Sequence, residues 1–118
     1  MSGFVLWPAV AVAGALGSMA RVTLAAWIGG AWGIACINLS GGLALGVMAG
    51  AGVQGDWMLV LGAGLLGSFT TFSTWMVDAL VLRDTGRTRA AAVNILGQAL
   101  VGLALAALGL ATGAAIAG

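Results

Sequence analysis

Four long apolar runs dominate this sequence, at about residues 4–28, 32–53, 57–82 and 90–117. A membrane-spanning helix needs about 20 mainly apolar residues, and each run supplies them. Backbone groups inside lipid must be paired within the protein, so only helices and closed barrels can cross it. These runs lack the alternation of barrel strands. The sequence therefore predicts an all-α membrane protein with one four-helix domain over residues 1–118 and both termini on one side.

Charged residues are scarce, at 6% of the chain, with no histidine and no lysine. No nucleophile–base pair is visible, which argues against an enzyme, and a net charge of +1 argues against nucleic-acid binding. The four arginines, Arg21, Arg83, Arg87 and Arg89, lie toward or beside the first and third loops, which share a side. The positive-inside rule then places these two loops in the cytoplasm of a cell membrane protein of fixed orientation.

Glycines recur at four-residue spacing in two of the runs. Gly42, Gly46 and Gly50 form one such stripe in the second run, and Gly109 and Gly113 form another in the fourth. Small residues at this spacing let helices approach closely in lipid. The stripes fit packing inside one four-helix unit or a contact between subunits, and the pattern leaves both open.

The segment "LGSFTTFSTWM" places four hydroxyl residues inside the third apolar run: Thr70, Thr71, Ser73 and Thr74. Three glycines precede them, and threonine is a poor helix former. We therefore expect the third helix to break near its middle. A break frees backbone groups that discontinuous membrane helices often use to bind ions.

Two aromatic residues in this segment, Phe72 and Trp75, are three apart and share a face if the helix resumes there. The edge of an aromatic ring is positive and can face an anion. The same spacing also fits lipid contact or core packing.

Two polar residues in other apolar runs stand out. Asn38, in "CINLSGG", carries an amide that either joins helices or contacts a solute. Arg21 is the one basic residue well inside an apolar run. It either extends to the membrane interface, holds a helix pair, or lines an ion entrance.

The segment "TTFSTWMVD" resembles the signature of the Fluc/CrcB family of fluoride channels. "GALGSMAR", residues 14–21, is similar to the family's opening G-x-x-G-x-x-x-R segment. "NLSGGLALG", residues 38–46, is similar to its N-x-x-G-x-x-x-x-G segment. Chain length, four spans and motif order agree, so the resemblance covers essentially the whole chain.

The resemblance implies a passive fluoride-selective channel that exports fluoride from the cytoplasm and protects against its toxicity. Family members form antiparallel dimers, with two fluoride pathways along the interface. By resemblance, Asn38 donates to fluoride, Phe72 and Trp75 present ring edges to it, and Ser73 and Thr74 form a hydroxyl track.

The resemblance also implies a structural sodium ion at the dimer centre. Its ligands would be the backbone carbonyls of Gly67 and Thr70 from each subunit. We expect both residues to lie in non-helical backbone with their carbonyls turned inward.

This sequence departs from the family pattern at several positions. Trp75 is larger than the usual second pore aromatic and carries an N–H donor, and Ile34 replaces a frequent threonine. Asn94 and Gln98, which we count among the pathway residues, stand where family members show an aromatic or histidine and then a serine. With the one-sided arginines, these departures favour a heterodimer with a paralogous chain, while a homodimer stays open.

Two other functions are compatible with four short spans. One is a partner subunit of a heterodimeric fluoride channel that conducts partly or not at all. The other is a small multidrug exporter, which needs a membrane-embedded carboxylate that alternately holds proton and drug. The first run has no Asp or Glu, which disfavours the exporter.

Overall fold

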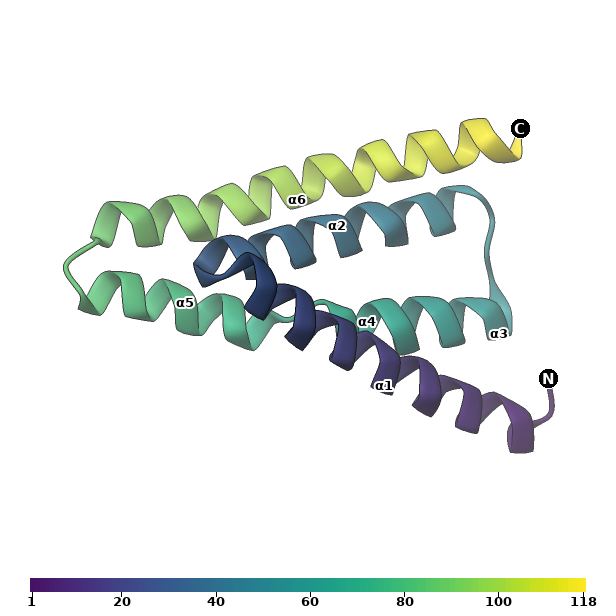
Figure 1. Ribbon diagram of the computed structural model, residues 1–118. Helices are drawn as coiled ribbons and strands as arrows, with labels where there is room; N and C mark the ends of the chain where they lie inside the picture. Colours follow the sequence, from purple (N-terminus) through teal and green to yellow (C-terminus); the bar gives the residue numbers. More distant parts are fainter.

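The computed structural model covers residues 1–118 and is entirely helical (Figure 1). The elements in chain order are α1 (Gly3–Ile28), α2 (Gly30–Gly50), α3 (Gly55–Trp57), the π-helical segment η1 (Met58–Leu66), α4 (Gly67–Phe69), α5 (Phe72–Asp84) and α6 (Thr88–Ala117). Elements α3 to α5 follow one another as a single stretch, Gly55–Asp84, so four stretches are long and apolar enough to cross a membrane. The all-α class with four spans is confirmed.

The helical stretches begin and end within three residues of the predicted span bounds. The largest difference is at α2, which ends at Gly50 rather than at residue 53. A turn follows, in which Gly52 has a φ of 83°, a conformation that favours glycine. The connection from α1 to α2 is shorter than predicted and consists of Gly29 alone, with a φ of 84°.

The helices run back and forth between two ends of the molecule. Both chain termini and the turn between α2 and α3 lie at one end, on the right in Figure 1. The turns between α1 and α2 and between α5 and α6 lie toward the other end. Arg83, Arg87 and Arg89 flank the α5–α6 turn, so these charges gather at that end.

Helices α2 and α6 pack closely because glycines line their contact (Figure 1). A Cβ atom built on Gly46 would lie 2.5 Å from the Ala106 carbonyl oxygen, and one on Gly109 would lie 2.5 Å from the Leu43 carbonyl oxygen. Gly50 and Gly113 meet the opposite backbone in the same way. These four glycines therefore serve packing inside the chain.

Gly42, the first member of the predicted stripe, behaves differently. A Cβ atom there would meet nothing within 4 Å. The reason is rotation around the helix axis: Gly42 borders an open groove rather than α6. Another close contact of this kind joins α1 to the third stretch, where a Cβ on Gly17 would meet the Leu65 carbonyl oxygen.

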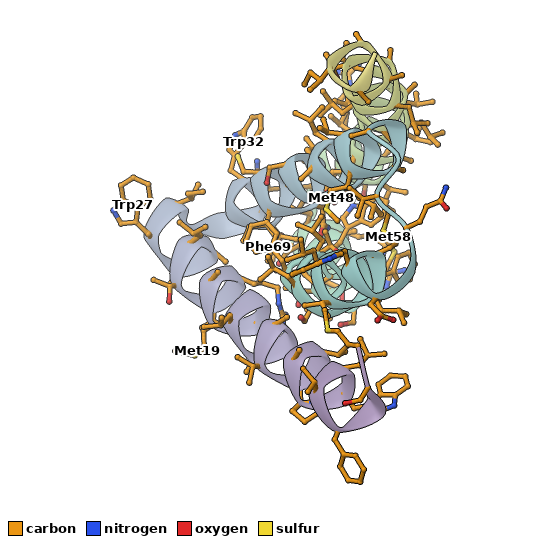
Figure 2. All side chains as sticks on the ribbon, turned by 90° about the vertical axis from the view of Figure 1, so that its right-hand side faces the viewer. Met19, Trp27, Trp32, Met48, Met58 and Phe69 are labelled. Atoms are coloured by element: carbon orange, nitrogen blue, oxygen red, sulfur yellow. The ribbon has the colours of Figure 1, made fainter.

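Most of the surface of the chain is apolar, and only 17 of 118 residues are buried within it. Exposed tryptophans mark both ends of the molecule. Trp7 and Trp57 lie toward the end with the termini, and Trp27 and Trp32 lie toward the other end. Figure 2 shows Trp27 and Trp32 projecting away from the helices. Tryptophan is enriched at membrane–water interfaces, so the apolar surface between these ends is one that lipid or another subunit covers.

Candidate functional site at the break in the third helical stretch

The third helical stretch is interrupted at two residues. Thr70 (φ −80°, ψ 156°) and Thr71 (φ −148°, ψ 124°) have extended backbone between α4 and α5. In a continuous helix the Thr71 N–H would bond to the Gly67 carbonyl and the Thr74 N–H to the Thr70 carbonyl. Instead the Thr71 N–H donates to Asn38 Oδ1 (2.7 Å) and the Thr74 N–H to Thr71 Oγ1 (3.3 Å). The predicted break is confirmed, and side chains replace the lost backbone bonds.

The predicted extent of the break was wrong at Gly67. This residue lies in α4 with helical dihedral angles (φ −63°, ψ −34°), not in non-helical backbone. The helical hydrogen bonds continue as far as the Thr70 N–H, which donates to the Leu66 carbonyl (3.0 Å). The chain leaves the helix only where Asn38 offers a competing acceptor to the next N–H.

The hydroxyl groups around the break divide into two sets. Ser68 Oγ donates to the Gly64 carbonyl, and Thr70 Oγ1 donates to the Leu66 carbonyl (3.1 Å), so both bond back to their own helix. Thr71 Oγ1 instead lies 3.3 Å from Thr74 Oγ1 and 3.5 Å from Ser73 Oγ. The second set forms a small hydroxyl cluster at the start of α5, where Thr71 is the N-cap.

Asn38 connects three parts of the chain. Its Oδ1 accepts from the Thr71 N–H, and its Nδ2 donates to the Thr71 carbonyl (2.9 Å) and to Gln98 Oε1 (3.4 Å). It thereby joins α2 to the break and to α6. Asn38 is half-buried, and of its two interpretations the joining of helices is the one with direct contacts in the structure.

Phe72 and Trp75 lie on one face of α5, as predicted. Their ring centroids are 5.7 Å apart at an interplanar angle of 86°, a T-shaped pair. Trp75 Nε1 donates to the Asn94 carbonyl (3.3 Å), which links α5 to α6. Phe72 is 69% exposed, so most of its ring faces outward from this chain.

Arg21 of α1 contacts the third helical stretch just before the break. Its Nε donates to the Ser68 carbonyl (3.1 Å), an acceptor close to the interrupted segment. Of the three interpretations given to Arg21, holding a helix pair is the one with a direct contact, because this bond joins α1 to α4.

Two grooves lie beside α6. The first, of about 560 Å³, lies at the break and is bordered by Asn38, Thr70, Thr71, Phe72, Trp75 and Gln98 among others. The second, of about 590 Å³, extends from Trp32 and Arg87 past Asn94 to Gln98. Gln98 borders both.

The structure therefore brings most of the predicted pathway residues together. Asn38, Phe72, Trp75 and Gln98 share the first groove, and Asn94 borders the second. Ser73 and Thr74 border neither, although they join the hydroxyl cluster through Thr71.

Sequence reasoning gave Thr71 no individual role beyond the break. It is nevertheless central, as the N-cap of α5 and the residue whose backbone Asn38 binds. Its position three residues before Thr74 is a capping signal, but its pairing with a residue 33 positions earlier leaves no local trace in the sequence.

The sequence is similar to known proteins over most of its length. The sequence model of the family described as CrcB-like protein, Camphor Resistance (CrcB), matches residues 8–110. The chain belongs to the CrcB-like family. It is 43% identical over 119 residues to fluoride-specific ion channel FluC 1 of Symbiobacterium thermophilum, covering 91% of this chain and 96% of that one. A second channel of that organism, FluC 2, is 41% identical over 106 residues (80% and 86%). FluC of Thermus thermophilus is 36% identical over 119 residues (92% and 94%).

Family membership confirms the resemblance carried by the three sequence motifs. Together with the four apolar stretches, it makes this CrcB-like protein a multi-pass membrane protein. The relatives are channels, so the family is one of ion channels rather than enzymes.

Proposed function

We propose that this CrcB-like protein is a subunit of a passive channel that selects fluoride and exports it from the cytoplasm, protecting the cell against fluoride toxicity. One observation carries the proposal. The groove at the helix break gathers two amide side chains and the T-shaped Phe72–Trp75 pair in the middle of an apolar chain. The fluoride channels to which the chain is 36–43% identical support it.

The chemistry of the groove suits a small, strongly hydrated anion. Amide N–H groups and positive ring edges replace water around an anion without placing a fixed charge beside it. The pathway we propose runs along Phe72 and Trp75 past Asn38 and Gln98, with Asn94 one helical turn away. Ser73 and Thr74 extend it through the hydroxyl cluster at the start of α5.

The pathway requires a second subunit because the groove is open on one side. Phe72 is mostly exposed, and an anion cannot cross beside lipid. We propose that a second subunit in antiparallel orientation covers it. The one-sided arginines fix the first and third loops in the cytoplasm, and a chain of fixed orientation cannot pair antiparallel with itself. A heterodimer with a paralogous chain therefore suits this protein better than a homodimer. One organism holding two similar channels, FluC 1 and FluC 2, supports that pairing.

A sodium ion at the dimer centre is also part of the proposal. The N–H groups that normally bond to the Gly67 and Thr70 carbonyls are diverted to Asn38 and to Thr71 Oγ1, so these oxygens fit a hard monovalent cation. Gly67 is exposed on this chain, which is what a shared site requires. Two subunits would supply four carbonyls, and the ion would contribute positive charge beside the pathways.

The test is fluoride efflux from liposomes that contain the purified protein, alone and together with a paralogous chain. We expect fluoride efflux without chloride efflux. Equal flux of chloride, or no fluoride flux in either preparation, contradicts the proposal. Flux only in the mixed preparation identifies the chain as one half of a heterodimeric channel. If, in the mixed preparation, substitutions in the paralogous chain change the flux and substitutions in this chain do not, this chain is a non-conducting subunit.

A further inference from the structure

The second groove follows one face of α6, from the α5–α6 turn inward. Arg87, the N-cap of α6, borders this groove, and so do Ala90, Asn94, Gln98 and Val101. These positions recur at intervals of three or four residues, so they share a face of the helix. The helical stretch from residue 87 to residue 101 is about 21 Å long. Because Gln98 also borders the groove at the break, the second groove reaches from the arginine-bearing end of the molecule to the depth of the break.

Arg87 is the one charged residue that borders either groove. The remaining lining residues are apolar or glycine, or they carry uncharged amide, indole or hydroxyl groups. Arg87 is exposed, and its guanidinium makes no hydrogen bond or ion pair within the chain. The acidic residue of the same turn, Asp84, pairs with Arg83 instead (3.1 Å). An uncompensated positive charge therefore lies at the outer end of a groove that is otherwise uncharged.

The turn holds Arg87 at this position through its backbone (Figure 1). The Arg87 N–H donates to the Leu82 carbonyl (2.8 Å), and the Gly86 N–H donates to the Arg83 carbonyl (3.0 Å). Gly86 has a φ of 81°, so these two bonds form the glycine-dependent motif that commonly ends a helix. The Arg87 carbonyl accepts from the Ala91 N–H (3.0 Å), which begins the hydrogen bonding of α6. The backbone of Arg87 is therefore fixed between two helices, and only its side chain is free to move.

We infer that Arg87 is the cytoplasmic entrance residue of the fluoride pathway and draws the anion from the cytoplasm into the second groove. The inference rests on the proposed channel function and on the proposed orientation, in which the α5–α6 turn is cytoplasmic. A hydrated fluoride ion that reaches this turn meets the guanidinium first and the amide-bearing face of α6 afterwards. None of the other three arginines borders the groove, so the role belongs to Arg87 alone.

The size of the effect follows from electrostatics at short range. In water, a unit charge raises the concentration of a monovalent counter-ion 4 Å away by roughly fivefold, and apolar groove walls strengthen the field. In about 0.1 M salt the attraction is screened over about 10 Å, so it acts at the mouth of the groove and not at the break. Chloride is attracted as strongly as fluoride. Arg87 therefore sets the rate of entry and leaves the choice between the two halides to the deeper groove.

Variants matched in charge test the inference in the liposome preparation that conducts fluoride. At fluoride concentrations where flux rises in proportion, Arg87→Gln should lower the flux about threefold to fivefold in about 0.1 M impermeant salt, and the loss should shrink in about 1 M salt. Arg87→Lys keeps the charge and most of the flux. Arg89→Gln removes the same charge from a position that borders neither groove, and it should conduct as the wild type does. Wild-type flux in Arg87→Gln, or an equal loss in Arg89→Gln, overturns the inference.

Chemical modification gives a second measurement on a folded channel. The chain has one native cysteine, Cys36, so Arg87→Cys is made together with Cys36→Ala. Once mass spectrometry has confirmed labelling, a thiol reagent that attaches a trimethylammonium group should restore the flux. A reagent that attaches a sulfonate group, similar in bulk and opposite in charge, should lower it further. Equal effects of both reagents, or no effect of either, show that the charge at this position does not control entry and overturn the inference.

The channel function and the entrance role fail in different ways. If the wild-type protein carries no fluoride in any preparation, the channel function is wrong and the entrance role falls with it. If the wild-type protein carries fluoride and the flux is insensitive to the charge at residue 87, the channel function stands and only the entrance role is removed.

Discussion

Asn38 binds the backbone of Thr71 at two points, accepting its N–H at 2.7 Å and donating to its carbonyl at 2.9 Å. This pairing gives the Thr71 N–H and carbonyl the partners that another peptide unit would offer. It lets the third helical stretch open without leaving these two part-buried groups unpaired. The break is therefore a side-chain-stabilised structure rather than a loose segment. Its geometry depends on the position of α2 relative to the third stretch.

Asn38→Ala should lower both stability and fluoride flux. The substitution removes the partners of the part-buried Thr71 N–H and carbonyl, and we expect a loss toward the lower end of the roughly 1–3 kcal/mol that a buried unpaired donor costs. It also frees the Gln98 amide to turn. Thermal unfolding in detergent measures the first effect and liposome efflux the second. Asn94→Ala is the stability control, because the Asn94 side chain makes no hydrogen bond, and equal losses in both variants would contradict the structural role of Asn38.

Phe72→Ala should lower fluoride flux with little loss of stability. The ring is 69% exposed, so its removal leaves only a small cavity, while the edge that faces the pathway disappears. We expect roughly a tenfold loss of flux, corresponding to about 1.4 kcal/mol of lost ion stabilisation. Val77→Ala, at another exposed position of α5, should leave the flux unchanged. A Phe72→Ala channel that conducts at the wild-type rate would remove this ring from the pathway.

Two glycines of α6 should respond to alanine with opposite signs. A Cβ at Gly113 meets the Val47 carbonyl, so Gly113→Ala should destabilise the protein by about 1–3 kcal/mol through overpacking. A Cβ at Gly97 meets nothing within 4 Å, so Gly97→Ala should stabilise the helix by up to about 1 kcal/mol. Unfolding midpoints in detergent measure both changes. A Gly113→Ala protein as stable as Gly97→Ala would contradict the α2–α6 packing.

Arg21→Met should destabilise the contact between α1 and α4. The variant keeps an apolar stem but loses the charged donor to the Ser68 carbonyl, a bond that contributes about 1.5–3 kcal/mol. Arg89→Met, near the start of α6, is the matched control and should change the unfolding midpoint little, because Arg89 makes no ion pair or side-chain hydrogen bond. If both variants unfold at the same temperature, Arg21 contributes nothing through Ser68.

Replacing sodium with a large organic cation should lower the stability of the assembled protein. Four carbonyl oxygens, from Gly67 and Thr70 of two subunits, suit a monovalent ion and would repel one another without it. Dissociation of the dimer in sodium chloride and in N-methylglucamine chloride measures the effect. An experimental structure should show density between the four oxygens. A dimer that is equally stable in both salts would leave the sodium site without support.

The lengths of the hydrophobic runs alone determined that there are four spans, and therefore that both termini lie at the same end of the molecule. In lipid, the backbone hydrogen bonds of a run of about 20 apolar residues without strand alternation can be made only within a helix, whichever elements pack beside it. The break followed from equally local information, since glycines precede threonines that bond to their own backbone. The π-helical segment Met58–Leu66 has no such signature, and it came to light only in the structure.

The tertiary structure decided the roles within the site. Thr71 lies 33 positions and Gln98 lies 60 positions after Asn38 in the chain. Their pairing with Asn38 therefore depends on the rotation and register of three helices. The same rotation turns Gly46 toward α6 and Gly42 toward the groove, although both belong to one stripe in the sequence. Hydrogen bonds are short and directional, so a change in helix rotation that leaves the apolar pattern intact reassigns every donor. For that reason the sequence indicated which residues gather at the break, and only the packed helices determined which hydrogen bonds join them.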